Sequence, residues 1–320
     1  MKNSYLVIAI VLCLGMLLLP LIATTDTNTP LSEVSPTPLA PTQDVFLVLD
    51  DKTDEIITLS AKDYITGVVC AEMSASFSPE ALKAQTVAAY TYASYKRYMR
   101  RNSSDPTEYD VTTSIGTDQA YISEAAAKEK YGENYEQYIS PIKQAVEQVL
   151  GEILTYNGAP ALTVYHSVSS SNTNSAKDVW GQDYPYLQSV ASKLDLMSEN
   201  YASEVTLSAQ EVETALEDLC ESDQDYANWF KDIITSPSGL VLSCNVAGKS
   251  IKGTDIRKAL GLKSATFYVS FSDDTFTFSV YGYGHGVGMS QYGANCMALK
   301  GYTYKEILAH YYPGCTLKNK

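Results

Sequence analysis

Residues 282–293 read Gly-Tyr-Gly-His-Gly-Val-Gly-Met-Ser-Gln-Tyr-Gly. They follow residues 275–281, in which apolar and polar side chains alternate as in a strand, and they run into a helical pattern over 289–299. Closely spaced glycines remove side chains along this junction, so the backbone can adopt positive φ angles and approach a ligand or another segment closely. The segment therefore predicts a crowded site in a fold that mixes strands and helices.

This segment is not a phosphate-binding loop, because no Gly-Lys-Ser or Gly-Lys-Thr follows the glycines, and His285 and Met289 break the dinucleotide-binding pattern. Two interpretations of His285 stay open. It is either a hydrogen-bond donor with a structural role or a site residue, since the flanking glycines offer it little packing. Ser290, Gln291 and Tyr292 are the other polar candidates in the segment.

Three hairpins are predicted, because short runs rich in β-branched and aromatic residues flank turn residues. The dipeptide Asn157-Gly158 is a strong signal of this kind. The predicted strand pairs are 44–49 with 55–59, 153–156 with 162–168, and 266–272 with 275–281.

Helices are predicted where apolar residues recur at helical spacing behind capping residues. Ser60 starts one helix and Ser78 starts the next, with Glu72 at the corner between them. The sequence thus predicts an α+β (mixed α/β) fold, with one large domain of helices and β-hairpins over 45–320. The predicted helices are 61–71, 79–100, 140–150, 209–220, 254–261, 289–299 and 304–310.

The composition is that of an acidic globular protein. The 320 residues include 23 Lys and Arg against 37 Asp and Glu, which gives a net charge of -14. Phosphate binding needs clustered cations, and the densest basic cluster, within residues 96–101, fits a solvated helix end. Nucleic acid is therefore excluded as a partner.

The first residues predict a single-pass membrane protein. Residues 5–23 are apolar throughout, and as a helix they would extend roughly 28 Å, which is close to a hydrocarbon core. Lys2 favours a cytoplasmic location for 1–4, which places the domain outside the cytoplasm. A cleaved signal peptide is the alternative, although no small-x-small site closes the run. Residues 24–44 are rich in Thr, Ser and Pro and predict a linker.

Cysteine usage indicates neither a disulfide framework nor a zinc knuckle. Outside the apolar run, five cysteines remain and no Cys-x-x-Cys pair occurs. One or two bridges stay open as an alternative to buried thiols. The five are Cys70, Cys220, Cys244, Cys296 and Cys315.

Glu72 is a candidate general acid. It is the lone carboxylate in the apolar run 68–73, where partial burial would raise its pKa, as a proton donor near neutral pH requires. The alternative is a glutamate that forms a salt bridge with Lys83 or another cation.

Nucleophilic and metal chemistry are weakly supported. His166 and Ser167 lie in a serine-rich segment, but no Gly-x-Ser-x-Gly elbow is present. The histidines at 166, 285 and 310 show no His-Glu-x-x-His spacing and no close cysteine partner. We therefore predict no catalytic metal and no cofactor.

Four segments resemble the signatures of the stage II sporulation protein D family. They are 63–73 around Glu72-Met73, 81–93 with its Ala-Leu-Lys-Ala-Gln start, Tyr165-His166-Ser167, and 284–294. The resemblance implies a lytic transglycosylase of an endospore-forming bacterium. Such enzymes are anchored in the mother-cell membrane and cut peptidoglycan glycan strands between N-acetylmuramic acid and N-acetylglucosamine during engulfment.

The resemblance also implies roles for individual residues. Glu72 corresponds to the catalytic acid, and Lys83 and His166 are expected to line the glycan groove. The other residues expected to contact substrate are Gln85, Ser167, His285, Gln291 and Tyr292.

Two departures from the family pattern stand out. Tyr90 replaces the usual arginine, so a guanidinium contact to substrate is lost or supplied elsewhere. Some relatives bind zinc through cysteines after the His-Ser segment, whereas residues 172–178 contain no cysteine. We therefore predict no such zinc here.

The expected mechanism needs only one carboxylate. Glu72 would protonate the leaving oxygen of N-acetylglucosamine and then accept the proton of the muramyl C6 hydroxyl as a 1,6-anhydro ring closes. Two rival functions remain. One is a non-catalytic wall-binding module like the amidase enhancers, and the other is a hydrolase that uses Asp178 or Asp183 as a second carboxylate.

The resemblance finally implies protein partners. These are the amidase stage II sporulation protein P, which strips stem peptides from the glycan, and the membrane scaffold stage II sporulation protein M.

Overall fold

A computed structural model describes residues 44–221 and 225–319. Helices and small sheets follow one another along the chain, which confirms the mixed fold class. None of the helices among the described residues is long and apolar enough to cross a membrane. The predicted cytoplasmic end 1–4, the predicted anchor 5–23 and nearly all of the predicted linker 24–44 lie outside the described residues.

The first predicted hairpin opens the larger of two hydrophobic cores. β1 (Val45–Leu49) pairs antiparallel with β2 (Ile56–Ser60), and β3 (Val111–Thr112) pairs parallel with β1. Phe46 and Val48 face the same side of β1 and are fully buried. This side of the strand packs against the helices that follow.

Two consecutive helices form the corner at Glu72. α2 (Ala61–Glu72) begins at Ser60, whose hydroxyl accepts a hydrogen bond from the backbone three residues on. α3 (Pro79–Arg101) begins after Ser78 as predicted, but the Ser78 side chain makes no capping bond. The backbone N–H of Ser78 instead donates to Asn295 Oδ1 at 2.8 Å. The start of α3 is therefore held by a distant segment.

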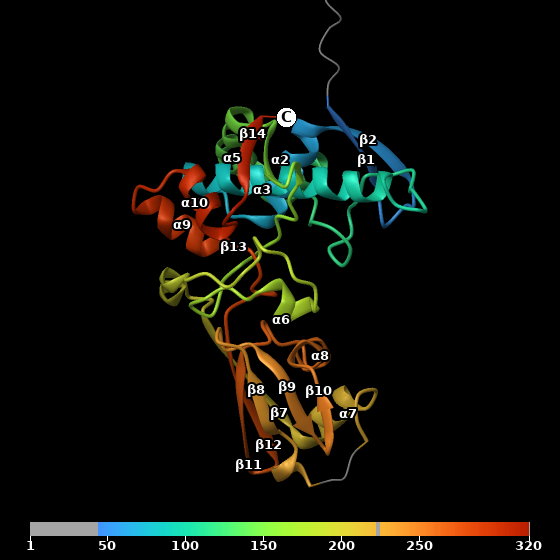
Figure 1. The fold of residues 1–320 in the computed structure, drawn as a ribbon, viewed down its shortest axis with the longest axis vertical. Helices are drawn as coiled ribbons and strands as arrows, with labels where there is room; N and C mark the ends of the chain where they lie inside the picture. Colours follow the sequence, from blue (N-terminus) through green and yellow to red (C-terminus); the bar gives the residue numbers. More distant parts are fainter. Residues whose placement is uncertain (1–43, 222–224, 320) are drawn as a thin grey trace, which may run out of the picture. The chain divides into compact units, whose positions relative to one another are not determined.

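α3 is the central helix of this core. It packs against α2, α5 (Tyr135–Val149), α9 (Gln291–Leu299) and α10 (Tyr304–Tyr311), as can be followed in Figure 1. α9 and α10 match the last two predicted helices. Thr303 and Glu306 form the capping box expected at the start of α10.

α5 begins earlier than the predicted 140–150. Pro141 lies inside the helix, although proline removes a backbone donor and favours a helix start. The apolar face extends before the proline, and Tyr135 and Ile139 on it are buried. Burial of this face outweighs the lost hydrogen bond.

The hairpin at Asn157-Gly158 forms with a shorter second strand than predicted. β4 (Glu152–Tyr156) pairs with β5 (Ala159–Pro160) across this turn. β14 (Thr316–Asn319) pairs with the other edge of β4. The last described strand therefore pairs with a strand from near the middle of the sequence.

A second hydrophobic core lies among strands between residues 202 and 281. β12 (Thr275–Tyr281) pairs antiparallel with β11 (Phe267–Ser272), as predicted, and with β7 (Ala202–Ser208). Phe276 and Phe278 alternate along β12 and are buried in this core.

An unpredicted sheet covers the same core. β9 (Val241–Val246) lies between β8 (Lys231–Thr235) and β10 (Lys249–Ile251). α7 (Ala209–Leu216) has the predicted capping box but ends before Cys220, and α8 (Gly253–Ala259) matches its prediction. The remaining elements are α4 (Glu124–Tyr131), α6 (Ala176–Trp180), and the 3-10 helices η1 (Gly132–Asn134), η2 (Lys193–Met197) and η3 (Tyr226–Asn228).

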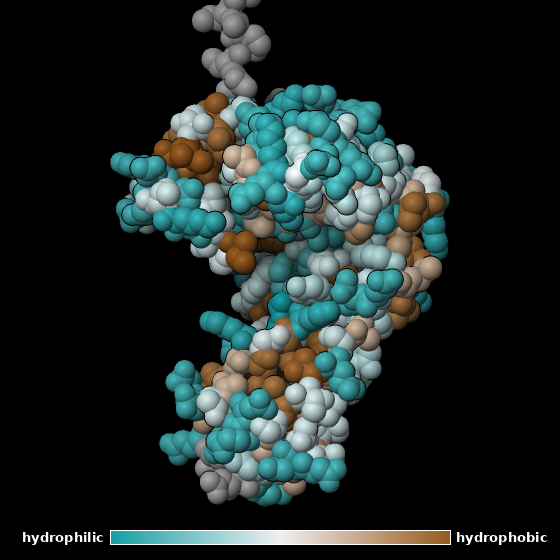
Figure 2. Space-filling view, turned by 180° about the vertical axis from the view of Figure 1, so that it is seen from behind, coloured by the Kyte–Doolittle hydropathy of each residue, from teal (hydrophilic) through white to brown (hydrophobic). Residues whose placement is uncertain are grey.

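On the face drawn in Figure 2, hydrophilic (teal) and intermediate (white) residues alternate, and hydrophobic (brown) residues gather in separate patches. Several exposed apolar side chains belong to segments that surround Glu72. Ile115 and Met197 are among them.

The glycine-rich segment returns the chain from the second core to the first. β13 (Met289–Ser290), within this segment, pairs in parallel with β6 (Tyr165–His166). The predicted strand 162–168 therefore pairs in part with the glycine-rich segment and not with the hairpin at Asn157-Gly158. Pairing between such distant parts of the chain is not visible in local sequence patterns.

Glycines, which have no side chain, make this pairing possible. A Cβ at Gly286 would lie 2.3 Å from Asn174 Nδ2, and a Cβ at Gly288 would lie 2.0 Å from the carbonyl oxygen of Val164. Both glycines also have positive φ angles, +76° and +72°. The predicted crowding is thus confirmed, and the close neighbours are other parts of the chain.

We expect Gly288→Ala to lower the free energy of unfolding much more than Gly301→Ala. Gly301 also has a positive φ, +91°, but nothing lies within 4 Å of its would-be Cβ. Strain alone should cost about 1 kcal/mol at Gly301, and overpacking should add about 1–3 kcal/mol at Gly288. Denaturant unfolding of the two variants measures the difference, and equal losses would contradict the close packing.

Candidate active site

Glu72 is the last residue of α2 and is half-buried. Its Oε1 accepts a hydrogen bond from the backbone N–H of Ala120 at 2.7 Å. Its own backbone carbonyl accepts a hydrogen bond from Gln291 Nε2 at 3.1 Å. The glycine-rich segment, through Gln291, therefore holds the helix end that presents the carboxyl group.

Burial raises the pKa of Glu72, because desolvation disfavours the charged form, and the hydrogen bond from Ala120 only partly opposes this. None of the ion pairs found among the described residues includes Glu72. Lys83 pairs instead with Glu80, at 2.7 Å. The predicted alternative of a salt bridge between Glu72 and Lys83 is therefore wrong.

Two pockets meet at Glu72, and together we call them the groove. The first, the Tyr292 pocket, has a volume of about 490 Å³. The second, the Trp180 pocket, has a volume of about 550 Å³. Glu72 lines both pockets, so a long ligand that occupied the groove would contact the carboxyl group of Glu72.

Four of the predicted site residues line the groove together with Glu72. Ser167, Gln291 and Tyr292 line the Tyr292 pocket, and His285 lines the Trp180 pocket. The Tyr292 hydroxyl donates to the carbonyl of Met197 at 3.0 Å, which ties two walls of its pocket together.

Three other predicted site residues line neither pocket. Lys83 lies against Glu80 and the ring of Tyr304. Gln85 is fully buried within α3, and its side-chain amide has no hydrogen-bond partner among the described residues. His166 is also buried, behind the wall that His285 forms.

The two histidines form a neutral pair whose ring centroids are 5.8 Å apart. Burial, with a smaller effect of His285, lowers the pKa of His166 to about 3. Burial and the charge of Arg257 lower the pKa of His285 to about 4. Val287 orients both rings, because its carbonyl lies 3.1 Å from His166 Nδ1 and its N–H donates to His285 Nδ1 at 3.0 Å.

Aromatic and apolar side chains line the groove in exposed positions. Trp180, at the end of α6, is 45% exposed and its ring centroid lies 5.3 Å from that of His285. Ile115 lines the same pocket, and Met197 lies in the other. The flat face of Trp180 is of the kind that stacks on the ring of a sugar.

Tyr90, at the position of the family's arginine, is buried and lines neither pocket. Its hydroxyl donates to the carboxylate of Asp44, which also pairs with Arg97 at 2.9 Å. The tyrosine is thus part of the core near the first strand.

Sequence reasoning missed two carboxylates near the groove. Glu199 is exposed and lines the Tyr292 pocket with Glu72, whereas Asp178 and Asp183, the predicted second carboxylates of a hydrolase, line neither pocket. Asp195, four residues before Glu199 in η2, is completely buried. No motif marks Asp195 or Glu199 in the sequence.

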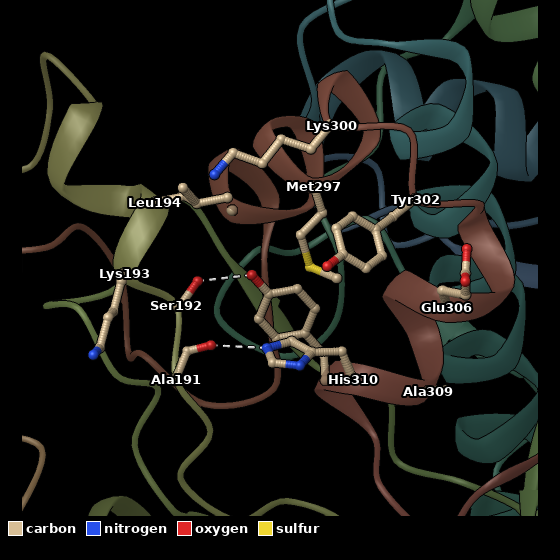
Figure 3. A pocket seen from close by; sticks show the side chains of 12 residues that line it. Ala191, Ser192, Lys193, Leu194, Met297, Lys300, Tyr302, Glu306, Ala309 and His310 are labelled. Atoms are coloured by element: carbon tan, nitrogen blue, oxygen red, sulfur yellow. Dashed lines mark hydrogen bonds between the residues drawn. The ribbon is translucent and has the colours of Figure 1, made fainter.

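Asp195 joins three segments around the groove. It accepts hydrogen bonds from the N–H and hydroxyl of Ser169, and from the Ser290 hydroxyl at 2.9 Å. Ser192, at the start of the same segment, shares a hydrogen bond of 2.7 Å with the Tyr311 hydroxyl. Figure 3 shows this bond in a third pocket, which does not include Glu72.

The described residues contain no cluster of three or more His, Cys, Asp or Glu side chains suited to a metal ion. All five cysteines outside the apolar run are free thiols. The alternative of one or two disulfide bridges among them is therefore not realised.

Asp195→Ala should lower the free energy of unfolding by about 2–4 kcal/mol, because it leaves buried donors without an acceptor. Asp183→Ala is the matched control, since Asp183 is exposed and accepts a hydrogen bond from the exposed Gln188. The control should change stability by less than about 0.5 kcal/mol. Thermal or denaturant unfolding measures both, and similar losses would refute the role of Asp195.

His166 should make the protein less stable in acid. Its pKa of about 3 in the folded state lies below the ordinary value of 6.5, so the unfolded chain binds the proton first as the pH falls below 6.5. Between pH 7 and 5, wild type should lose about 2 kcal/mol more unfolding free energy than His166→Gln. Unfolding curves at both pH values give the comparison, and parallel losses would contradict a neutral buried imidazole.

Comparison with known proteins agrees with the signature segments. A family model described as stage II sporulation protein matches residues 49–156, which include Glu72. The chain is 39% identical over 254 residues to stage II sporulation protein D of Bacillus subtilis (strain 168), covering 79% of this chain and 73% of that protein.

Two further relatives cover a similar share of the chain. Stage II sporulation protein D of Bacillus amyloliquefaciens is 38% identical over 254 residues, or 79% of this chain and 72% of that protein. The amidase enhancer of Bacillus subtilis (strain 168) is 32% identical over 307 residues, or 79% of this chain and 40% of that protein. The extent and level of identity show that the chain belongs to the stage II sporulation protein D family.

Proposed function

We propose that the chain is a lytic transglycosylase that cleaves peptidoglycan glycan strands between N-acetylmuramic acid and N-acetylglucosamine, and that it acts in engulfment during sporulation. The observation that carries the proposal is the position of Glu72. A half-buried carboxyl group of raised pKa lies where two pockets meet. A strand that occupies both pockets places an internal linkage at this group.

The hydrogen bonds of Glu72 indicate which oxygen reacts. Oε1 accepts from Ala120, which leaves Oε2 to carry the proton. In the proposed step, Oε2–H protonates the O4 leaving group of N-acetylglucosamine as its bond to the muramyl C1 breaks. The C6 hydroxyl of the muramyl residue then bonds to C1 and returns its proton to Glu72, so the product is a 1,6-anhydro sugar and the enzyme is regenerated.

The surroundings of Glu72 suit this cycle. Burial keeps the carboxyl group protonated nearer to neutral pH, and the nucleophile comes from the substrate, so no second carboxylate is needed. Trp180 and Tyr292 offer aromatic surfaces on either side of Glu72 for successive sugars. The neutral His285 adds a hydrogen-bonding ring without a charge.

Two observations favour rival functions, which the experiment below must also distinguish. An amidase enhancer is 32% identical to the chain, which favours a non-catalytic wall-binding module as the second candidate. Glu199, in the same pocket as Glu72, would be the natural second carboxylate of a hydrolase.

The proposal extends to location and partners. Residues 5–23 would anchor the chain in the mother-cell engulfing membrane with the described residues outside the cytoplasm. Stage II sporulation protein P would supply peptide-free strands as the amidase, and stage II sporulation protein M would serve as the membrane scaffold.

Digestion of peptide-free glycan strands tests the proposal. Wild type should release strands with 1,6-anhydromuramyl ends, and Glu72→Gln should be at least about 100-fold slower, because it lacks the proton donor. Glu199→Gln, which removes the other carboxylate of the same pocket, should still give anhydro ends. Mass spectrometry identifies the products.

The rival functions give different products. Reducing ends from wild type that disappear in Glu199→Gln would show a hydrolase. Strand binding without any cleavage would show an accessory module and would overturn the proposal.

A further inference from the structure

Arg257 is a cation without an acidic partner. It lies on α8, is half-buried, and its Nε donates to the carbonyl of Leu262 at 3.3 Å. Among the described residues, no Asp or Glu forms an ion pair with it, whereas Arg97, Arg100 and Arg101 are all paired with aspartates. Partial burial of an unpaired charge is unfavourable, so an anion that binds there would relieve it.

Arg257 lines neither pocket, but backbone hydrogen bonds connect its segment to the edge of the Trp180 pocket. The Leu262 N–H donates to the Arg257 carbonyl at 3.0 Å, and the next carbonyl, that of Lys263, accepts from the N–H of Gly284 at 2.9 Å. Gly284 precedes His285, which lines the pocket. The charge of the guanidinium contributes, after burial, to the lowered pKa of His285.

Aromatic rings and a second cation lie on or against the segments that these hydrogen bonds join. Tyr283 is 44% exposed, and the ammonium group of Lys263 lies 5.3 Å from its ring centroid. Trp180, also exposed, lies against His285 on the pocket side. Two cations beside exposed aromatic rings form a surface for a sugar that bears a negative charge, on a chain whose net charge is -14.

The proposed substrate carries such a charge. Muramic acid differs from glucosamine by a lactyl ether, whose carboxylate is free when no stem peptide is attached. A guanidinium can hold a carboxylate through two parallel hydrogen bonds, and such charge-assisted bonds are stronger than neutral ones. Glucosamine units offer no comparable group, so this contact would distinguish the two sugars.

We propose that Arg257 binds a carboxylate carried by the glycan strand, next to the Trp180 pocket, and makes the enzyme selective for strands that bear it. The inference rests on the proposed function, because it takes the groove as a glycan site. The carboxylate can come from the lactyl group of a peptide-free strand or from a stem peptide, and the test separates these sources.

Binding is measured with the full-length chain that carries Glu72→Gln, so that strands are not cut. The probes are peptide-free strands, the same strands with their carboxylates converted to methylamides, and peptide-bearing strands. The starting chain should bind free carboxylates about tenfold more tightly than methylamides, or better. Adding Arg257→Gln should reduce this ratio to about one.

Lys258→Gln is the matched control. It removes the same charge from the next residue of α8, which is exposed. It should keep the preference for free carboxylates. Arg257→Lys, which keeps the charge but loses the planar fork, should give an intermediate ratio, and this variant serves if Arg257→Gln folds poorly.

The outcomes are distinct. A preference that depends on Arg257 and appears with peptide-free strands identifies the lactyl carboxylate, and one that appears only with peptide-bearing strands identifies the stem peptide. Equal ratios for Arg257→Gln and Lys258→Gln would overturn the inference. The proposed function is tested separately. If wild type does not cleave the strands, the proposed function is contradicted, but the binding ratio can still be measured with the Glu72→Gln chain.

Discussion

The close approach of the glycine-rich segment to residues 164–174 is the constraint on which the rest of the structure depends. A side chain at Gly288 would collide with the backbone of Val164, so β13 and β6 can pair only because it is absent. The segment itself carries the chain from the second core, at Val280, to the first, at Val287. It also delivers Gln291 to the end of α2, where the side chain holds Glu72 in place. The glycines therefore act on the proposed chemistry through packing.

The polar groups around the groove have different roles. Glu72 is the titratable group whose raised pKa suits proton donation. His166 and His285 are kept neutral by burial and serve as oriented rings. Asp195 binds serines from segments far apart in the chain and so fixes the walls. These contacts leave the carboxyl group of Glu72, with its raised pKa, at the junction of the two pockets.

Local sequence patterns predict the helices and strands better than they predict the contacts between distant segments. The hairpins around β1 and β12 and the helix at Glu72 follow from alternation, helical spacing and caps, which act over a few residues. Lys83 pairs with Glu80 one turn away, and a position on a helix does not reveal which neighbour a side chain selects. The predicted contact of His166 with substrate is not supported, since tertiary packing buries that ring. Asp195 lies in η2 and Glu199 in the turn that follows, neither within a motif, and only the folded chain shows that Glu199 lines the groove and that Asp195 binds its neighbours.

The origin of the oxygen at the new strand end is the most direct measurement of the central claim, that Glu72 serves an internal nucleophile. Peptide-free strands are cleaved in water enriched in heavy oxygen, and the products are weighed by mass spectrometry. The account predicts anhydromuramyl ends that carry no heavy oxygen, because the C6 oxygen of the substrate closes the ring. Reducing ends that contain heavy oxygen would show that water is the nucleophile and would contradict the account.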